Sequence, residues 1–277
     1  MRTRRATSVF VACTAAFLAA CSPVRGGEEP SFSALSYKNL IPNESYSPAT
    51  APLAPGTALD LSGDEPRPGA YFNYQSCTAA WSFTLADART IAVTASHCGK
   101  PGDKVWAGTA DGDFSYPAEP IGEVIYSDFY AEDSHDLDVA FIEITGSADY
   151  YVPGAVDNSV ATSLAHLPLH VCKLGRVTDE TCGTLIHGAA MAQLNSGGLQ
   201  RDSIAARARV CSTNGDSGGP VYGEVEGKQT IVGVVSGTTQ RLEEGHTCET
   251  TQTDMELSFT LATDIQVLAK EVLGPMA

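Results

Sequence analysis

The segment Gly215–Pro220, with the sequence Gly-Asp-Ser-Gly-Gly-Pro, constrains this chain more than any other stretch. Glycines on both sides of Ser217 let the backbone turn sharply and present two amide N–H groups beside one hydroxyl. Acyl transfer needs such an arrangement, because one loop then supplies the nucleophile and the donors that stabilise the oxyanion. A serine between glycines is often only a turn, so a catalytic interpretation requires a base and an orienting carboxylate elsewhere.

Both groups lie upstream of Ser217. His97 ends one apolar, strand-like run, and Asp138 opens another. Asp133 and Asp136 are close enough in sequence to compete for the orienting role, but neither directly precedes the apolar run. An α/β-hydrolase would need its serine first and its histidine last, and no well-placed acid and histidine follow the serine here. The predicted catalytic order is therefore His97, Asp138, Ser217.

Three motifs together resemble those of the chymotrypsin-like (trypsin-fold) serine peptidases: Thr-Ala-Ser-His-Cys at 94–98, Asp-Val-Ala-Phe-Ile at 138–142 and Gly-Asp-Ser-Gly-Gly-Pro at 215–220. The segments at 171–175 and 181–184 look more like the bacterial streptogrisin branch than the animal branch. The resemblance covers roughly residues 70–265. It implies an all-β fold of two six-stranded antiparallel β-barrels with a C-terminal helix, and an active site in the cleft between the barrels.

The resemblance also assigns roles to the candidate residues. Ser217 is the expected nucleophile, His97 the base that takes its proton and returns one to the leaving amine, and Asp138 the group that orients the histidine. The backbone N–H groups of Gly215 and Ser217 are the expected oxyanion hole. Removing such a donor costs roughly 3–4 kcal/mol of barrier.

The resemblance also implies the walls of the primary specificity pocket, at Ser212, Thr213 and Asn214 before the nucleophile and at Ser236, Gly237 and Thr238 after the strand. No acidic residue lies at 211–214, so a preference for Arg or Lys has no support. Val235 stands where glutamate-specific relatives tend to carry a histidine. Thr238 in place of the usual glycine could narrow the pocket, which favours small or medium apolar residues, although Asp254 could reach it.

Asp216 raises the question of activation. In animal members of the family a freed apolar N-terminus pairs with this carboxylate, and no Ile-Val-Gly-Gly start lies near Ala70. The bacterial branch uses an internal basic residue, for which Lys173 is the first candidate and Arg176 the second. The resemblance therefore implies a domain that is active without cleavage at one specific peptide bond.

Residues 1–20 are typical of an export signal. Three arginines at positions 2, 4 and 5 precede an apolar stretch too short to span a bilayer. The segment closes with Leu-Ala-Ala-Cys, which resembles the bacterial lipobox, in which Cys21 is acylated and becomes the new N-terminus. A lipoprotein is the favoured interpretation, and plain secretion is the alternative.

Residues 21–69 contain eight prolines among Ser, Ala and Gly and show little apolar periodicity. This composition predicts a tether or a short propeptide, and the sequence does not separate the two. Residues 70–277 then form one catalytic domain.

The chain carries a net charge of −16, and removing residues 1–20 takes away three arginines and no acids, which gives −19. This charge argues against nucleic acid and against electrostatic binding to anionic lipid. Membrane association would then depend on the lipid at Cys21. We expect protein or peptide substrates and no cofactor, and the sequence predicts no oligomeric state.

Cys13 lies in the signal and Cys21 directly follows it, which leaves six of the eight cysteines, and six allow 15 pairings. The resemblance implies the pairs Cys77–Cys98, Cys172–Cys182 and Cys211–Cys248. Each bridge contributes roughly 2–4 kcal/mol. A zinc site is the rival interpretation, but the chain lacks a Cys-x-x-Cys pair. His166 and His170 have the spacing of a helical metal pair, but Pro168 lies between them, so no metal is expected.

Short runs rich in β-branched and aromatic residues predict strands at 80–85, 90–94, 138–144, 221–224 and 230–236. Near the C-terminus, an apolar face predicts one helix that Thr263 caps and Gly274 ends.

The favoured function is an exported serine endopeptidase. An esterase that uses the same triad, and an inactive binding module on the same fold, remain open because a fold does not fix a function.

Overall fold

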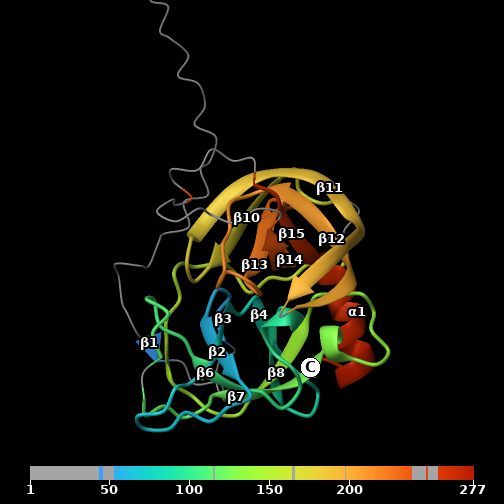
Figure 1. The fold of residues 1–277 in the computed structure, drawn as a ribbon. Coiled ribbons are helices and arrows are strands. Elements are labelled where there is room, and N and C mark those ends of the chain that lie inside the picture. The colour runs from blue at the N-terminus through green and yellow to red at the C-terminus, as the bar shows by residue number, and fades with distance from the viewer. Residues whose placement is uncertain are drawn as a thin grey trace, which may run out of the picture. The chain divides into compact units, whose positions relative to one another are not determined.

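The structure is a computed structural model that describes residues 44–45, 53–114, 116–163, 166–196, 198–238, 248 and 255–277 (Figure 1). The predicted export signal, Cys21 and most of the predicted tether lie outside these residues. Within the described ranges, no helix has both the length and the apolar character needed to cross a membrane.

The first half of the domain is a seven-stranded antiparallel sheet with the strand order β3-β2-β6-β7-β8-β5-β4. Its strands are β2 (Ala58–Ser62), β3 (Gln75–Thr78), β4 (Trp81–Thr84), β5 (Thr90–Thr94), β6 (Lys104–Ala107), β7 (Gly122–Ser127) and β8 (Ala140–Ile144). The two outermost strands, β3 and β4, are consecutive in the chain and only Ala79 and Ala80 separate them. The continuous segment 75–84 therefore forms both edge strands of the sheet. If β3 and β4 are taken as one segment, six chain segments form the seven strands.

The second half is a closed antiparallel barrel with the order β10-β11-β12-β15-β14-β13. Its strands are β10 (His170–Gly175), β11 (Asp179–Ser196), β12 (Leu199–Arg209), β13 (Pro220–Val225), β14 (Lys228–Thr238) and β15 (Leu257–Leu261). A small pair, β1 (Glu44–Ser45) and β9 (Asp149–Tyr150), stands apart from both sheets. The prediction of an all-β chymotrypsin-like fold with a C-terminal helix is confirmed. The strands of each half are contiguous in the sequence.

Strand β5 shows why the apolar run at 90–94 folds as it does. Ile91 and Val93 belong to one buried cluster, which also takes in side chains of the closed barrel and of the C-terminal helix. Ala92, between them, belongs to a second cluster formed by the first sheet. Successive side chains of a strand point to opposite faces, so three consecutive apolar residues at 91–93 fit a strand that is buried on both sides. The predicted bounds of this strand match the observed ones.

The N-terminal boundary differs from the expected one. Strand β2 lies within 21–69, yet it pairs with both β3 and β6, and all five of its residues are buried. Leu53 is also buried, at 1% exposure. Because removing β2 would leave β3 without a partner strand and would expose one edge of β6, the folded domain begins before residue 70.

The C-terminal helix α1 spans Ala262–Leu273 and starts earlier than predicted. Strand β15 runs directly into it, so the N-cap position falls on Leu261 and no side chain caps the helix. The predicted capping role of Thr263 is wrong, because that residue already lies in the first turn. Gly274 ends the helix with a φ of +91°, a conformation that glycine adopts without a steric penalty.

Candidate active site

His97 and Asp138 meet at the end of β5. His97 lies in a short 3-10 helix, Ser96–Cys98, that follows this strand directly, and Asp138 lies two residues before β8. These two strands pair with each other along their full length. The Nδ1 atom of His97 is 2.8 Å from Oδ2 of Asp138, and the carboxylate is fully buried whereas the imidazole is 11% exposed.

Three further donors hold the carboxylate of Asp138. Oδ1 accepts hydrogen bonds from the Ser96 hydroxyl at 2.7 Å and from the His97 backbone N–H at 3.2 Å. Oδ2 also accepts one from the Ser236 hydroxyl at 2.5 Å. Burial by itself raises the pKa of Asp138, but His97 and the two hydroxyls hold it below its ordinary value. The carboxylate is therefore ionised at neutral pH.

The same pair changes the basicity of His97. Burial lowers the pKa of this imidazole, but the charge of Asp138 and its hydrogen bond outweigh burial, and the pKa lies above its ordinary value of 6.5. Asp138 thus stabilises an imidazolium at this position.

The loop that carries Ser217 turns through two left-handed glycines, Gly215 with a φ of +99° and Gly218 with a φ of +85°. A Cβ atom at Gly218 would overlap the backbone carbonyl of Thr78 and the hydroxyl of Thr94. Only glycine allows this approach. Since Thr94 is the last residue of β5, the loop of Ser217 lies against the segment that leads into His97.

The two amides expected to form the oxyanion hole differ from their neighbours. The N–H groups of Asp216, Gly218 and Gly219 each donate to a backbone carbonyl. In the described part of the chain, those of Gly215 and Ser217 donate to no acceptor. Two uncommitted donors beside one serine hydroxyl are what an oxyanion site requires.

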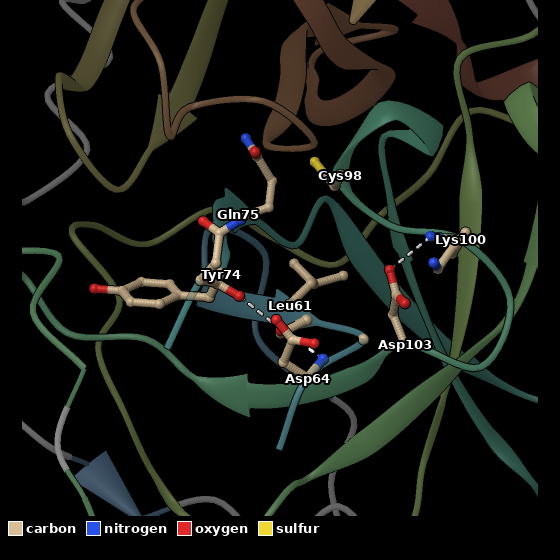
Figure 2. Close-up of a pocket in the computed structure, with 10 residues that line it drawn as sticks. Leu61, Asp64, Tyr74, Gln75, Cys98, Lys100 and Asp103 are labelled. Carbon is tan, nitrogen blue, oxygen red and sulfur yellow. Dashed lines mark hydrogen bonds between the residues drawn. The ribbon is translucent and has the colours of Figure 1, made fainter. Parts of the chain in front are cut away.

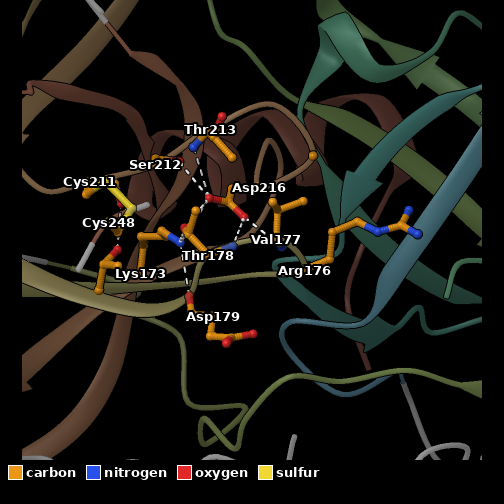
Figure 3. Close-up of polar contacts among 12 residues, drawn as sticks. Lys173, Arg176, Val177, Thr178, Asp179, Cys211, Ser212, Thr213, Asp216 and Cys248 are labelled. Carbon is orange, nitrogen blue, oxygen red and sulfur yellow. Dashed lines mark hydrogen bonds and ion pairs between the residues drawn. A yellow bond between two sulfur atoms is a disulfide. The ribbon is translucent and has the colours of Figure 1, made fainter. Parts of the chain in front are cut away.

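A buried ion pair holds Asp216, the residue before Ser217 in this loop (Figure 3). The Nζ atom of Lys173 is 3.0 Å from Oδ2 of Asp216, and both side chains are fully buried. The carboxylate also accepts hydrogen bonds from the backbone N–H groups of Val177, Thr178 and Thr213. Burial raises the pKa of Asp216, but Lys173 and Thr178 hold it below its ordinary value. The prediction that Lys173 is the internal basic partner is confirmed.

Arg176, the second candidate for that role, pairs elsewhere. Its Nη1 atom lies 2.5 Å from Oδ1 of Asp60 and 2.9 Å from the carbonyl oxygen of Leu59, and Nη2 lies 2.6 Å from that of Thr109. This buried ion pair joins the closed barrel to β2. No local sequence pattern predicts this pair, because Asp60 lies in the proline-rich segment expected to be a tether and 116 residues separate the partners.

Two of the six residues expected to line the specificity pocket use their hydroxyls elsewhere. Ser212 donates to Asp216 at 3.2 Å, and Ser236 donates to Asp138. The pairing of β14 with β15 shifts register between Val235 and Gly237, and such a bulge re-aims a side chain.

The other four, Thr213, Asn214, Gly237 and Thr238, are partly or fully exposed. Asp254 and the segment 239–247 lie outside the described residues. The predicted side-chain preference stays a prediction.

Three disulfides join the pairs that the resemblance implied. Their Cα–Cα distances are 6.2 Å for Cys77–Cys98, 4.0 Å for Cys172–Cys182 and 5.6 Å for Cys211–Cys248. The first ties β3 to the 3-10 helix of His97. His170 lies within 4.8 Å of the sulfur atoms of the second bridge, but thiolates are the metal-binding form of cysteine and both sulfurs are bonded to each other.

A cavity of about 310 Å³ opens next to the His97 segment, on the first sheet (Figure 2). Its lining includes Cys98, Gln75 and Lys100, together with two carboxylates. Asp64 is exposed, and Asp103 is 8% exposed. Oδ2 of Asp103 accepts a hydrogen bond from the Lys100 backbone N–H at 2.9 Å, and Oδ1 has no partner among the described residues. The cavity is thus polar, and its charged lining residues are two carboxylates and one lysine.

The fold and this geometry define a chymotrypsin-like serine protease scaffold. A model of the trypsin family matches residues 64–252, a range that contains His97, Asp138 and Ser217. The chain belongs to the trypsin family.

Solved structures share the fold at low sequence identity. Protease A of Thermobifida fusca is 21% identical, with a TM-score of 0.53, over 82% of this chain and 99% of that one. A protease of Nocardiopsis is 20% identical, with a TM-score of 0.50, over 79% and 96%. A glutamic acid-specific serine protease is 19% identical, with a TM-score of 0.52, over 81% and 100%. No curated protein matches the chain.

Proposed function

We propose that this protein is an exported serine endopeptidase that cleaves peptide bonds through an acyl-enzyme on Ser217. One observation carries the proposal. In a trypsin-family chain, His97 follows β5 and pairs with Asp138 at 2.8 Å, and the loop of Ser217 packs against the end of the same strand at Gly218.

His97 is the base in this proposal. Its Nδ1–H donates to Asp138, so Nε2 carries the lone pair that takes the proton of the Ser217 hydroxyl as the oxygen attacks the scissile carbonyl. Asp138 holds this tautomer and stabilises the imidazolium, and it stays ionised throughout. The backbone N–H groups of Gly215 and Ser217 stabilise the oxyanion that forms.

The imidazolium of His97 then gives its proton to the leaving amine, and the carbon–nitrogen bond breaks. Water attacks the ester on Ser217 with His97 again as base, and the carboxylic acid leaves as the serine regains its proton. Every proton and bond in this cycle is accounted for by Ser217, His97, the substrate and one water molecule, so the reaction needs no cofactor.

Proton transfer to the leaving amine places the leaving half of the substrate on the His97 side. The cavity beside Cys98 lies on that side, and we propose that it receives residues of the leaving half. The acyl half would contact Thr213, Asn214 and the segment 236–238, with the preference for small or medium apolar residues given above.

The location follows from the N-terminus. An export signal, a lipobox-like Cys21 and a proline-rich segment favour a catalytic domain that a lipid anchors to the cell envelope and a tether holds clear of it. Secretion without a lipid is the alternative.

The test of function uses the exported protein and a fluorophosphonate probe. We expect the wild type to be labelled and Ser217→Ala to be unlabelled, with Ser82→Ala, a buried serine of β4, labelled at the wild-type rate. A peptide-library digest then separates a peptidase from an esterase. A folded wild type that neither reacts with the probe nor cleaves peptides would contradict the proposal and favour a binding module.

A further inference from the structure

Thr78, the last residue of β3, contacts the nucleophile loop at two points. Its backbone N–H donates to the carbonyl oxygen of Ser217 at 2.8 Å, and its hydroxyl donates to the carbonyl oxygen of Gly215 at 2.8 Å. Its own carbonyl oxygen lies where a side chain at Gly218 would stand. Thr78 is fully buried, so no water competes for these bonds.

The hydroxyl proton of Thr78 has one destination. The hydroxyl oxygen accepts a hydrogen bond from the backbone N–H of Arg176 at 3.2 Å. A hydroxyl has one proton to donate and two lone pairs to accept with. Because Arg176 supplies the accepted bond, the proton of Thr78 is directed to Gly215.

The other side of Gly215 is confined as well. A Cβ atom at this glycine would lie 2.7 Å from Cγ2 of Val177. The peptide that carries the Gly215 carbonyl is also held at its N–H, that of Asp216, which donates to Thr213 at 3.1 Å. Gly215 has a φ of +99°, and glycine changes its backbone angles more easily than any other residue. The orientation of its N–H therefore depends on contacts made by its neighbours.

We propose that Thr78 is a positioning residue for the oxyanion hole. By holding the Gly215 carbonyl, its hydroxyl fixes the backbone angles of this glycine and aims the Gly215 N–H at the substrate oxyanion. The inference rests on the proposed function, and it assigns the role to a side chain of the first sheet that lies outside the nucleophile loop.

The role predicts a defect in transition-state stabilisation with substrate binding retained. Thr78→Val keeps the β-branched shape and removes the hydroxyl, and Thr78→Ser keeps the hydroxyl and removes the methyl group. We expect Thr78→Val to lower kcat about 10- to 100-fold with KM within about 2-fold, because oxyanion donors act mainly in the transition state. Thr78→Ser should stay within about 3-fold of the wild type.

The experiment compares the wild type and both variants as exported full-length proteins, after circular dichroism and melting curves show that each is folded at the assay temperature. Steady-state kinetics on a peptide substrate give kcat and KM. Affinity for a peptide trifluoromethyl ketone, whose adduct carries an oxyanion, should fall in Thr78→Val by the same factor as kcat/KM. The pH midpoint of kcat/KM should be the same in Thr78→Val as in the wild type, because the His97–Asp138 pair is unchanged.

Amide hydrogen exchange of a peptide covering 213–219 provides a readout that needs no activity. We expect at least about 10-fold faster exchange in Thr78→Val than in the wild type or Thr78→Ser, since a freed glycine opens locally. Unchanged kcat or unchanged exchange in folded Thr78→Val would overturn the inference. An equal loss in Thr78→Ser would overturn it too, because it would point to packing of the methyl group. A wild type that does not react with the fluorophosphonate probe would contradict the proposed function instead, and the exchange data would still test Thr78.

Discussion

The hydroxyl of Ser236 donates to Oδ2 of Asp138 at 2.5 Å, so a strand of the closed barrel reaches the carboxylate that the seven-stranded sheet supplies. The same oxygen accepts the hydrogen bond of His97. The orientation of the imidazole thus depends on both halves of the domain, although His97 and Asp138 come from one half.

The first prediction concerns pH. His97 must be neutral to act as a base, and its pKa is raised by Asp138 in spite of burial. We therefore expect kcat/KM to fall as the pH drops, with a midpoint above the ordinary value of about 6.5. Rates measured from acid to alkaline pH give the midpoint, and a value at or below that of free histidine would contradict this prediction.

A second prediction follows from the same carboxylate. Ser236→Ala removes a donor to Asp138, which leaves more of its negative charge to act on His97. We expect the acid midpoint of kcat/KM to move upward. Ser82→Ala removes an equally buried hydroxyl, which donates to the carbonyl oxygen of Leu53, and should leave the midpoint unchanged. A downward shift in Ser236→Ala would argue against this reasoning.

The third prediction tests which carboxylate orients His97. Asp138→Asn should lower kcat about 10⁴-fold while the fold persists, because an amide at this position favours the wrong tautomer of His97. Asp133→Asn, an exposed position five residues upstream, should retain wild-type kcat. Steady-state kinetics decide between them, and a comparable loss in both variants would reject the assignment.

The fourth prediction concerns the ion pair behind the nucleophile loop. Lys173→Met leaves Asp216 buried without a counter-charge, which should reduce the free energy of unfolding by about 3–5 kcal/mol and abolish fluorophosphonate labelling. Adding Asp216→Asn should restore part of the stability, because partners in one pair are not additive. Urea denaturation measures the free energy of unfolding of the single and the double variant, and the probe measures the loss of labelling.

The pH dependence of this pair has a definite sign. The folded-state pKa of Asp216 lies below its ordinary value, so the stabilisation is present above the unfolded pKa of about 3.9 and is lost as the pH falls through the folded value. Lys173→Met should lose this component of acid sensitivity. An unchanged acid-unfolding curve would show that the pair contributes nothing.

The fifth prediction tests the N-terminal boundary. A chain of residues 70–277 lacks β2 and with it the buried Leu59 and Leu61, whose burial contributes roughly 2–3 kcal/mol each. We expect this chain to be insoluble or unreactive, and a chain of residues 22–277 to fold and react with the probe. Equal labelling of the two chains would show that β2 is dispensable.

The parts of the site that local sequence encodes were predictable. Short motifs fix His97 and Ser217, because a sharp turn needs glycine at fixed offsets, and β5 carries three consecutive buried apolar residues at 91–93. Strand β2 carries a weaker signal, because prolines lie on both sides of it and Asp60 interrupts its apolar residues. The Arg176–Asp60 pair and the hydroxyl of Thr78 carry no local signal, since tertiary packing alone brings their partners together. The Ser236 side chain points to Asp138 because of a β-bulge between Val235 and Gly237, and no residue type at these positions predicts the bulge.

Because the strands of each half are contiguous in the sequence, synthesis completes the two halves one after the other. The first half supplies His97 and Asp138, whereas Ser217 belongs to the second half. A ribosome that stalls, or a translocation event that stops, before residue 217 releases a fragment with a base and a carboxylate but without a nucleophile. Under the proposed function, an unfinished chain therefore has no peptidase activity, and activity arises only after the segment that carries Ser217 has been made.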